Sequence, residues 1–118
     1  MTNVQVEVDL YSGRENPRWD LGEAETALFR TRLADLLPAG AGVSSVPDGL
    51  GYRGLHVAIR TDGATRHLRI AAGVVIVESA TGAERRSLRD PGRGLEKWLL
   101  RTGKEHLGAE LLRYLLGE

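Results

Sequence analysis

Apolar and polar residues alternate from the start of the chain. The apolar members of this pattern are Val4, Val6, Val8 and Leu10, and a polar residue stands between each pair. A period of two residues places one face of a strand in the core and the other face in water. We therefore predict a strand over residues 4–10.

The spacing then becomes helical. The apolar residues that recur at three- and four-residue intervals are Leu21, Ala24, Leu28, Phe29, Leu33, Leu36 and Leu37. Asp20 and Glu23 have the spacing of a capping box, which predicts that the helix begins at Asp20. Pro38 and Gly40 are expected to end the helix, because neither residue favours its continuation.

Three apolar runs in the middle of the chain predict consecutive short strands. Asp62-Gly63 and Ala72-Gly73 lie between these runs and are typical of tight turns. A two-residue turn at the first of these sites pairs Val57 with Leu68, so apolar residues face each other. Residues 84–88 are expected to add a charged edge strand.

The C-terminal region predicts two helices. Asp90-Pro91 is typical of a helix start, and Gly103 and Gly117 are expected to end the first and second helix. The apolar stripes are Leu95, Trp98, Leu99 and Thr102 in the first helix, and Leu107, Leu111, Tyr114 and Leu115 in the second. The sequence thus predicts one α+β domain over residues 1–118. We expect an antiparallel sheet of four to five strands with the helices packed mainly on one face.

Composition excludes several classes of function. The chain has 118 residues, its 16 basic and 16 acidic residues cancel, and it contains no cysteine. A neutral domain does not attract phosphate backbones or anionic lipid strongly, so we expect neither nucleic acid nor membrane as a partner. Absence of cysteine excludes disulfides and thiolate metal sites. No secretory signal or long apolar run is visible, so a cytoplasmic protein without a cofactor is expected.

Residues 12–19, Ser-Gly-Arg-Glu-Asn-Pro-Arg-Trp, form the most distinctive segment. Arg14 offers planar bidentate donors to a carboxylate or phosphate, and Trp19 offers a flat contact surface. The alternative is a rigid connector, in which Arg14 or Glu15 pins the loop and Trp19 plugs one end of the core. The candidate ligand-binding residues of this segment are Ser12, Arg14, Glu15, Asn16 and Trp19.

A second candidate lies in the irregular stretch before residue 55. Residues 49–54, Gly-Leu-Gly-Tyr-Arg-Gly, match the spacing G-x-G-x-x-G. In a dinucleotide site this loop opens a helix, but here it opens a predicted strand, so we do not expect nucleotide binding. Either the segment is a plain loop, or it covers a pocket where Tyr52 and Arg53 contact a ligand.

Three stretches of the chain, VDLYSGRENPRWDL, LGYRG and LEKWLLRTG, resemble a small actinobacterial family without known activity. Members of that family start with a strand and an SGRxNPxW motif, and the resemblance spans most of the chain. Proline usually stands there where this chain has Glu15. The resemblance implies a group of residues to consider together, namely Ser12, Gly13, Arg14, Asn16, Pro17, Trp19, Tyr52, Arg53 and Gly54.

We interpret the histidines and the clustered arginines as solvated surface residues rather than as binding sites. The predicted register places His56 and His67 on one polar face and His67 opposite Glu78. Arg69 lies beside them and disfavours a cation, so a solvated face is expected rather than a metal site. Four arginines crowd into residues 85–93, and we interpret them as part of a solvated edge rather than a nucleic-acid patch.

These patterns favour a small non-catalytic binding or accessory protein that recognises a small anionic molecule or peptide. Segments 12–19 and 49–54 would meet if the first strand lay parallel to the strand from residue 55, through a helical crossover. One alternative is a metal-independent cyclase, isomerase or hydrolase-like enzyme with Glu15 or a histidine as its base. Another is a homodimer module with an exposed apolar patch made by Leu100, Leu112 and Leu116.

Overall fold

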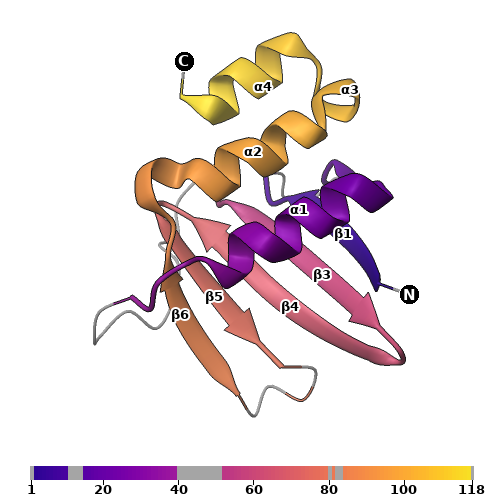
Figure 1. Ribbon diagram of the computed structural model, residues 1–118. Coiled ribbons are helices and arrows are strands. Elements are labelled where there is room, and N and C mark those ends of the chain that lie inside the picture. Colours follow the sequence, from indigo (N-terminus) through magenta and orange to yellow (C-terminus); the bar gives the residue numbers. More distant parts are fainter. Residues whose placement is uncertain (1, 11–14, 40–51, 80, 82–83, 118) are drawn as a thin grey trace.

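The computed structural model contains a six-stranded antiparallel sheet with helices on one side (Figure 1). It describes residues 2–10, 15–39, 52–79, 81 and 84–117. The strands are β1 (Thr2–Val8), β2 (Arg18–Asp20), β3 (Leu55–Thr61), β4 (Ala64–Ala71), β5 (Val74–Glu78) and β6 (Arg85–Arg89). The sheet order is β2-β1-β3-β4-β5-β6. The α+β prediction is confirmed, with a slightly higher strand count than the four to five expected.

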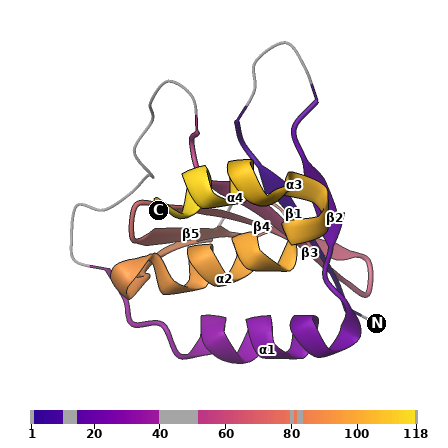
Figure 2. The same ribbon diagram turned by 90° about the horizontal axis from the view of Figure 1, so that it is seen from above.

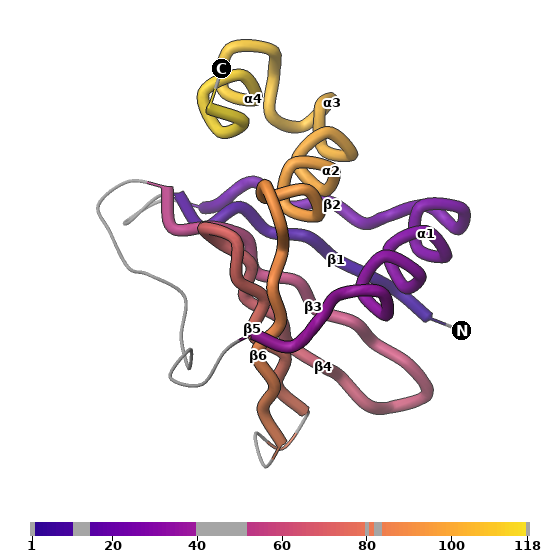
Figure 3. The backbone as a smooth tube through the Cα atoms, turned by 60° about the vertical axis from the view of Figure 1, so that its left-hand side comes forward, coloured from indigo at the N-terminus to yellow at the C-terminus, as the bar shows by residue number. Residues whose placement is uncertain are grey.

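The helical layer covers only part of the sheet. Its elements are α1 (Glu23–Ala34), the 3₁₀ helix η1 (Pro91–Arg93), α2 (Gly94–Thr102), α3 (Lys104–Leu107) and α4 (Ala109–Leu116). Figure 2 shows α1 and α2 running side by side. In Figure 3, these two helices lie on the same side of the sheet, and α4 lies beyond α2. The inward sheet face and this layer therefore enclose the core between them.

The core follows from strand alternation. Along the central strands, residues that face the helices alternate with residues on the opposite face, which we call the outer face. Most of the helix-facing residues are buried, whereas Arg66 is exposed. Side chains with no exposed surface include Val4, Val6, Val8, Phe29, Leu55, Val57, Leu68, Ile70, Val75, Leu99 and Leu100. The inward face is thus defined by residue parity along each strand.

The predicted hairpin register is confirmed. Val57 lies opposite Leu68, and Ile70 lies opposite Val75 across the next pair of strands. Both turns begin with a residue of positive φ, 44° at Asp62 and 51° at Ala72, and each is followed by glycine. This backbone suits the twist of a two-residue hairpin turn, and Ala72 adopts it despite its Cβ.

The first strand pair is antiparallel like the rest of the sheet, so the parallel arrangement considered as a condition for the two loops to meet is not formed. β1 and β3 are neighbours, but they run antiparallel, with Val8 opposite Leu55. The short β2, which the hydrophobic pattern did not predict, first pairs with the other edge of β1. The chain then passes through α1 and returns to the end at which β1 stops. No parallel crossover is formed between β1 and β3.

The first helix starts and ends differently from the prediction. Asp20 lies in β2, and α1 begins at Glu23, where the Glu25 carboxylate accepts a hydrogen bond from the Gly22 N–H at 3.0 Å. The helix ends at Ala34, before Pro38, because residues 37–39 pair with β6. Three members of the predicted apolar stripe are exposed, namely Ala24, Leu28 and Leu37, and Leu37 lies beyond the end of the helix.

Asp90 precedes Pro91 at the start of the 3₁₀ helix η1, as the sequence predicts, but its side chain caps α2, which begins three residues later than expected. Its carboxylate accepts hydrogen bonds from the N–H groups of Leu95 and Glu96, at 2.8 and 3.0 Å. Gly103 ends α2, and the predicted second helix is divided at Gly108 into α3 and α4.

The proposed apolar patch on the C-terminal helices is contradicted by burial. Leu100 is fully buried and Leu116 is 7% exposed, because both pack into the core. Leu112 is half-buried against that core. These leucines therefore cannot form the exposed dimer surface that was considered.

Candidate functional site

The described parts of the two predicted loops meet at the end of β1. The Asn16 side-chain oxygen accepts from the Leu10 N–H at 3.1 Å. The Arg53 N–H donates to the Asp9 carbonyl at 2.8 Å, and the Asp9 N–H donates to the Gly54 carbonyl at 2.9 Å. Both segments thus lie beside one strand end, although the strands are antiparallel. Ser12, Arg14 and residues 49–51 lie outside the described residues.

Tyr52 and Arg53 point to opposite faces of the sheet, as consecutive residues of an extended segment do. The Tyr52 hydroxyl donates to the Glu96 carboxylate of α2 at 2.5 Å. The Arg53 guanidinium instead donates to Asp9 at 2.9 Å, on the outer face. These two side chains therefore do not line one shared cleft.

The Tyr52 side joins the loop to the helices. Glu96 is only 1% exposed, and Arg93 donates to its carboxylate at 2.7 and 3.2 Å. Arg93 also donates to the Leu115 carbonyl of α4 at 3.0 Å. Burial raises the pKa of Tyr52 above its ordinary value, and the hydrogen bond to Glu96 adds to this effect. The network satisfies a buried carboxylate and connects three segments.

Trp19 is part of the core. It is 4% exposed, its indole N–H donates to the Thr102 hydroxyl at 2.9 Å, and its ring stacks on His106. A methyl group added to Gly103 would lie 2.2 Å from this ring, so a glycine is needed there. This packing agrees with the connector interpretation of the segment.

The other described residues of the segment also contact the protein itself. Glu15 has a side chain that is 83% exposed and lies 3.7 Å from Arg18. The Asn16 amide donates to the Glu7 carboxylate at 3.0 Å. Ligand binding by this segment stays a prediction.

The outer face carries a polar cluster beside Arg53. Asp9 accepts from both Arg53 and Arg69, at 2.9 and 3.3 Å. The Nε atoms of these arginines are buried and have no hydrogen-bond partner among the described residues. The rings of His56 and His67 stack nearby, with nitrogen atoms 3.1 Å apart.

Burial and neighbouring charges determine the ionisation of His56 in this cluster. Burial lowers the pKa of His56, and the charges of His67 and Arg69 lower it further, which favours the neutral imidazole. His67 lies opposite Glu78, as predicted. Within the described ranges, no group of three or more histidine, aspartate or glutamate side chains is placed to hold a metal ion.

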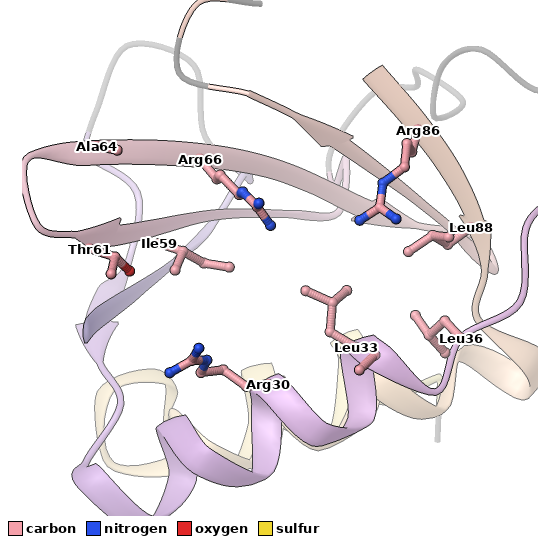
Figure 4. Close-up of a pocket in the computed structure, with 10 residues that line it drawn as sticks. Arg30, Leu33, Leu36, Ile59, Thr61, Ala64, Arg66, Arg86 and Leu88 are labelled. Atoms are coloured by element: carbon pink, nitrogen blue, oxygen red, sulfur yellow. The ribbon is translucent and has the colours of Figure 1, made fainter. Parts of the chain in front are cut away.

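A pocket of about 510 Å³ lies on the other face, between α1 and the sheet (Figure 4). It occupies the part of the inward face that the helices leave uncovered. Its apolar surface comes from Leu33, Leu36, Ile59 and Leu88, and its cations are Arg30, Arg66 and Arg86. Ala34, Thr61 and Ala64 complete the lining. A volume of this size is typical of small-molecule sites.

The arginines enter this pocket because of strand parity. Arg66 shares the inward face of β4 with Leu68, and Arg86 shares that of β6 with Leu88. In Figure 4, the guanidinium groups of Arg66 and Arg86 point from the sheet toward α1. Arg30 comes from α1 and lies 3.5 Å from the Thr2 hydroxyl. We did not predict this pocket, although arginine at inward positions was a visible signal.

The pocket has the chemistry of an anion site next to an apolar wall. None of the described residues that line it is acidic. Within the described part of the chain, none of its arginines forms an ion pair with a carboxylate. Guanidinium groups donate planar pairs of hydrogen bonds to carboxylates and phosphates, and the leucine and isoleucine side chains offer apolar contact.

Comparisons with family models, curated proteins and solved structures find no match to this chain. Among the described residues, no helix has the length and apolar character required to cross a membrane. The chemistry of the pocket is therefore the main guide to the function of this chain.

Proposed function

We propose that this chain is a non-catalytic binding protein for a small amphipathic anion. Its ligand carries a phosphate, sulfonate or carboxylate on an apolar body and binds in the pocket between α1 and the sheet. One observation carries the proposal: Arg66 and Arg86 occupy inward positions beside an apolar wall, and no acidic side chain stands among the described residues of the pocket lining. The sequence also led us to expect a small anionic ligand, but at segments 12–19 and 49–54 rather than in this pocket.

The two inward arginines destabilise the fold only slightly. Arg66 and Arg86 are exposed, so water can hydrate both guanidinium groups when no anion is bound. A hydrogen bond between a guanidinium and an anion contributes roughly 1.5–3 kcal/mol when it is sheltered. Apolar burial adds about 25 cal/mol per Å². Both parts of the ligand are therefore needed for appreciable affinity, and neither an alcohol nor inorganic phosphate should suffice.

The lining favours binding over catalysis. General acid–base catalysis needs a group that exchanges a proton near neutral pH, such as a carboxylate or an imidazole. The pocket residues include arginines, aliphatic side chains and Thr61, and arginine stays protonated under all ordinary conditions. The histidines His56 and His67 lie on the outer face, away from this lining. This separation supports a binding role.

Calorimetric titration with octyl phosphate tests the proposal, with octanol and inorganic phosphate as the two half-ligands. We expect octyl phosphate to bind and both half-ligands to bind at least tenfold more weakly. Arg66→Gln and Arg86→Gln should each reduce the affinity for octyl phosphate by about three- to fivefold, the effect of losing one exposed ion pair.

Arg60→Gln is the matched control. Arg60 is an exposed arginine of β3 that does not line the pocket, and its loss changes the net charge by the same amount. It should leave the affinity within twofold of the unmodified protein. Absence of octyl phosphate binding, or equal losses in all three variants, would contradict the proposal.

A further inference from the structure

A second hollow, of about 330 Å³, adjoins the pocket. The two hollows share Arg66 and Arg86, and the remaining lining of the second consists of Val77, Ser79 and Glu84. Both arginines therefore stand between an apolar compartment and a polar one. A ligand held at the arginines could extend into both.

Glu84 is the distinctive group of the second hollow. Of the described residues that line the two hollows, it alone is acidic. Its backbone exchanges hydrogen bonds with Ser79: the Glu84 N–H donates to the Ser79 hydroxyl at 3.2 Å, and the Ser79 N–H donates to the Glu84 carbonyl at 3.0 Å. These bonds position Glu84 on β6's extension, two residues before Arg86.

The Glu84 carboxylate is not neutralised by its cationic neighbours. No ion pair within the described residues joins Glu84 to Arg66 or Arg86, although all three line one hollow. Glu78 differs, because it pairs with Arg85 at 3.5 Å. An anion bound to the two arginines would place a second negative group near the Glu84 carboxylate. A cationic group on that anion would offset this charge.

The apolar, cationic and acidic side chains follow one another in the order in which a ligand could carry an alkyl chain, an anion and a cation. Along β6 and its extension, Leu88, Arg86 and Glu84 share one parity, so an apolar side chain is followed by a cation and then by a carboxylate. Resting on the proposed function, we infer that the preferred ligand is an alkyl phosphodiester of a primary amino alcohol. Its alkyl chain lies against Leu33 and Ile59, its phosphate binds Arg66 and Arg86, and its ammonium group donates to Glu84.

Three ligands with the same octyl chain test this inference by calorimetry, each below the concentration at which it forms micelles. Octyl phosphate has no cation, octyl phosphoethanolamine has an ammonium with N–H donors, and octyl phosphocholine has a quaternary ammonium without donors. We expect phosphoethanolamine to bind about three- to fivefold more tightly than phosphocholine, the effect of one exposed ion pair with a hydrogen bond.

Glu84→Gln should abolish this preference and leave octyl phosphate binding unchanged or slightly stronger. Glu78→Gln is the matched control, since Glu78 is a carboxylate on β5 that lines neither hollow, and it should preserve the preference. Glu84→Ala serves as a second variant, and circular dichroism checks that each variant is folded.

The outcomes separate the two proposals. If octyl phosphate binds but Glu84→Gln leaves the ranking of the three ligands unchanged, or no ranking exists, the headgroup inference is wrong and the proposed function stands. If none of the three ligands binds the unmodified protein, the proposed function itself fails, and the inference fails with it.

Discussion

Arg66 of β4 lies directly opposite Ile59 of β3, on the sheet face where the neighbouring pair is Val57 and Leu68. A charged side chain at an inward position usually costs free energy, because the inward face is apolar. Here α1 does not seal this end of the sheet, and Arg66 reaches water through the pocket. The open pocket thus keeps the Arg66 charge hydrated, and it also places this cation beside an apolar wall.

The first prediction concerns the apolar wall. Leu33→Ala should weaken octyl phosphate binding by about threefold, because it removes part of the surface that the alkyl chain would contact. Leu28→Ala is the control on the same helix. Leu28 is 52% exposed and does not line the pocket, so its loss should leave binding unchanged in the same titration. Equal affinities of the two variants would argue against the alkyl chain lying on α1.

The second prediction concerns the contact between Gly103 and Trp19. Gly103→Ala should lower the free energy of unfolding by about 1–3 kcal/mol, because the added methyl group overlaps the indole ring. Gly94→Ala is the control: its methyl group would lie 3.9 Å from a carboxylate oxygen of Asp90, and the site has helical angles. We expect that control to be neutral or slightly stabilising in urea unfolding. A stable Gly103→Ala variant would mean that Trp19 can repack.

The third prediction concerns Tyr52. Tyr52→Phe leaves the buried Glu96 carboxylate with one donor fewer and should cost about 1.5–3 kcal/mol of unfolding free energy. The same change at Tyr114, which is 65% exposed, should have no measurable effect. Because the pKa of Tyr52 is raised in the folded state, its contribution is fully present below the ordinary value of 10.0 and declines at higher pH.

The fourth prediction concerns pH and His56. Burial lowers the pKa of His56 below 6.5, so the unfolded chain binds a proton more readily than the folded one. Unfolding free energy should therefore be highest above pH 6.5 and decrease as the pH falls below that value. His56→Gln should flatten this decrease in urea titrations between pH 7.5 and pH 5. His106→Gln is the control, because it retains His56 and should show the same decrease in unfolding free energy. If the decrease persists in His56→Gln, groups other than His56 cause it.

Local patterns predicted much of the sheet correctly. The hairpin register follows from turn chemistry and residue parity over short distances, and this is why Val57 and Leu68 were paired correctly. The Asp90 cap was likewise readable, because its partners lie five and six residues away. The start of α1 was predicted incorrectly. Asp20 and Glu23 have the spacing of a capping box, but Asp20 pairs with Gln5 in the sheet instead.

The candidate site depended on contacts between distant segments. Tyr52 and Arg53 looked like one recognition pair, but an extended backbone directs them to Glu96 and Asp9 on different faces. The positions of Arg66 and Arg86 on inward faces were visible in the alternation of their strands. Whether α1 would cover those positions or leave a pocket was not visible, because it depends on the angle at which a helix packs on a twisted sheet.

The amino-acid sequence alone therefore determined the class of the domain, the hairpins of β3 to β5 and the capped start of the C-terminal helices. Each depends on side chains that are close along the chain, so local geometry decides it. Only the tertiary structure decided that β1 and β3 run antiparallel, that Trp19 packs against Gly103, and that three arginines meet beside an apolar wall. These features arise from packing among segments far apart in the chain, where no local period specifies the outcome.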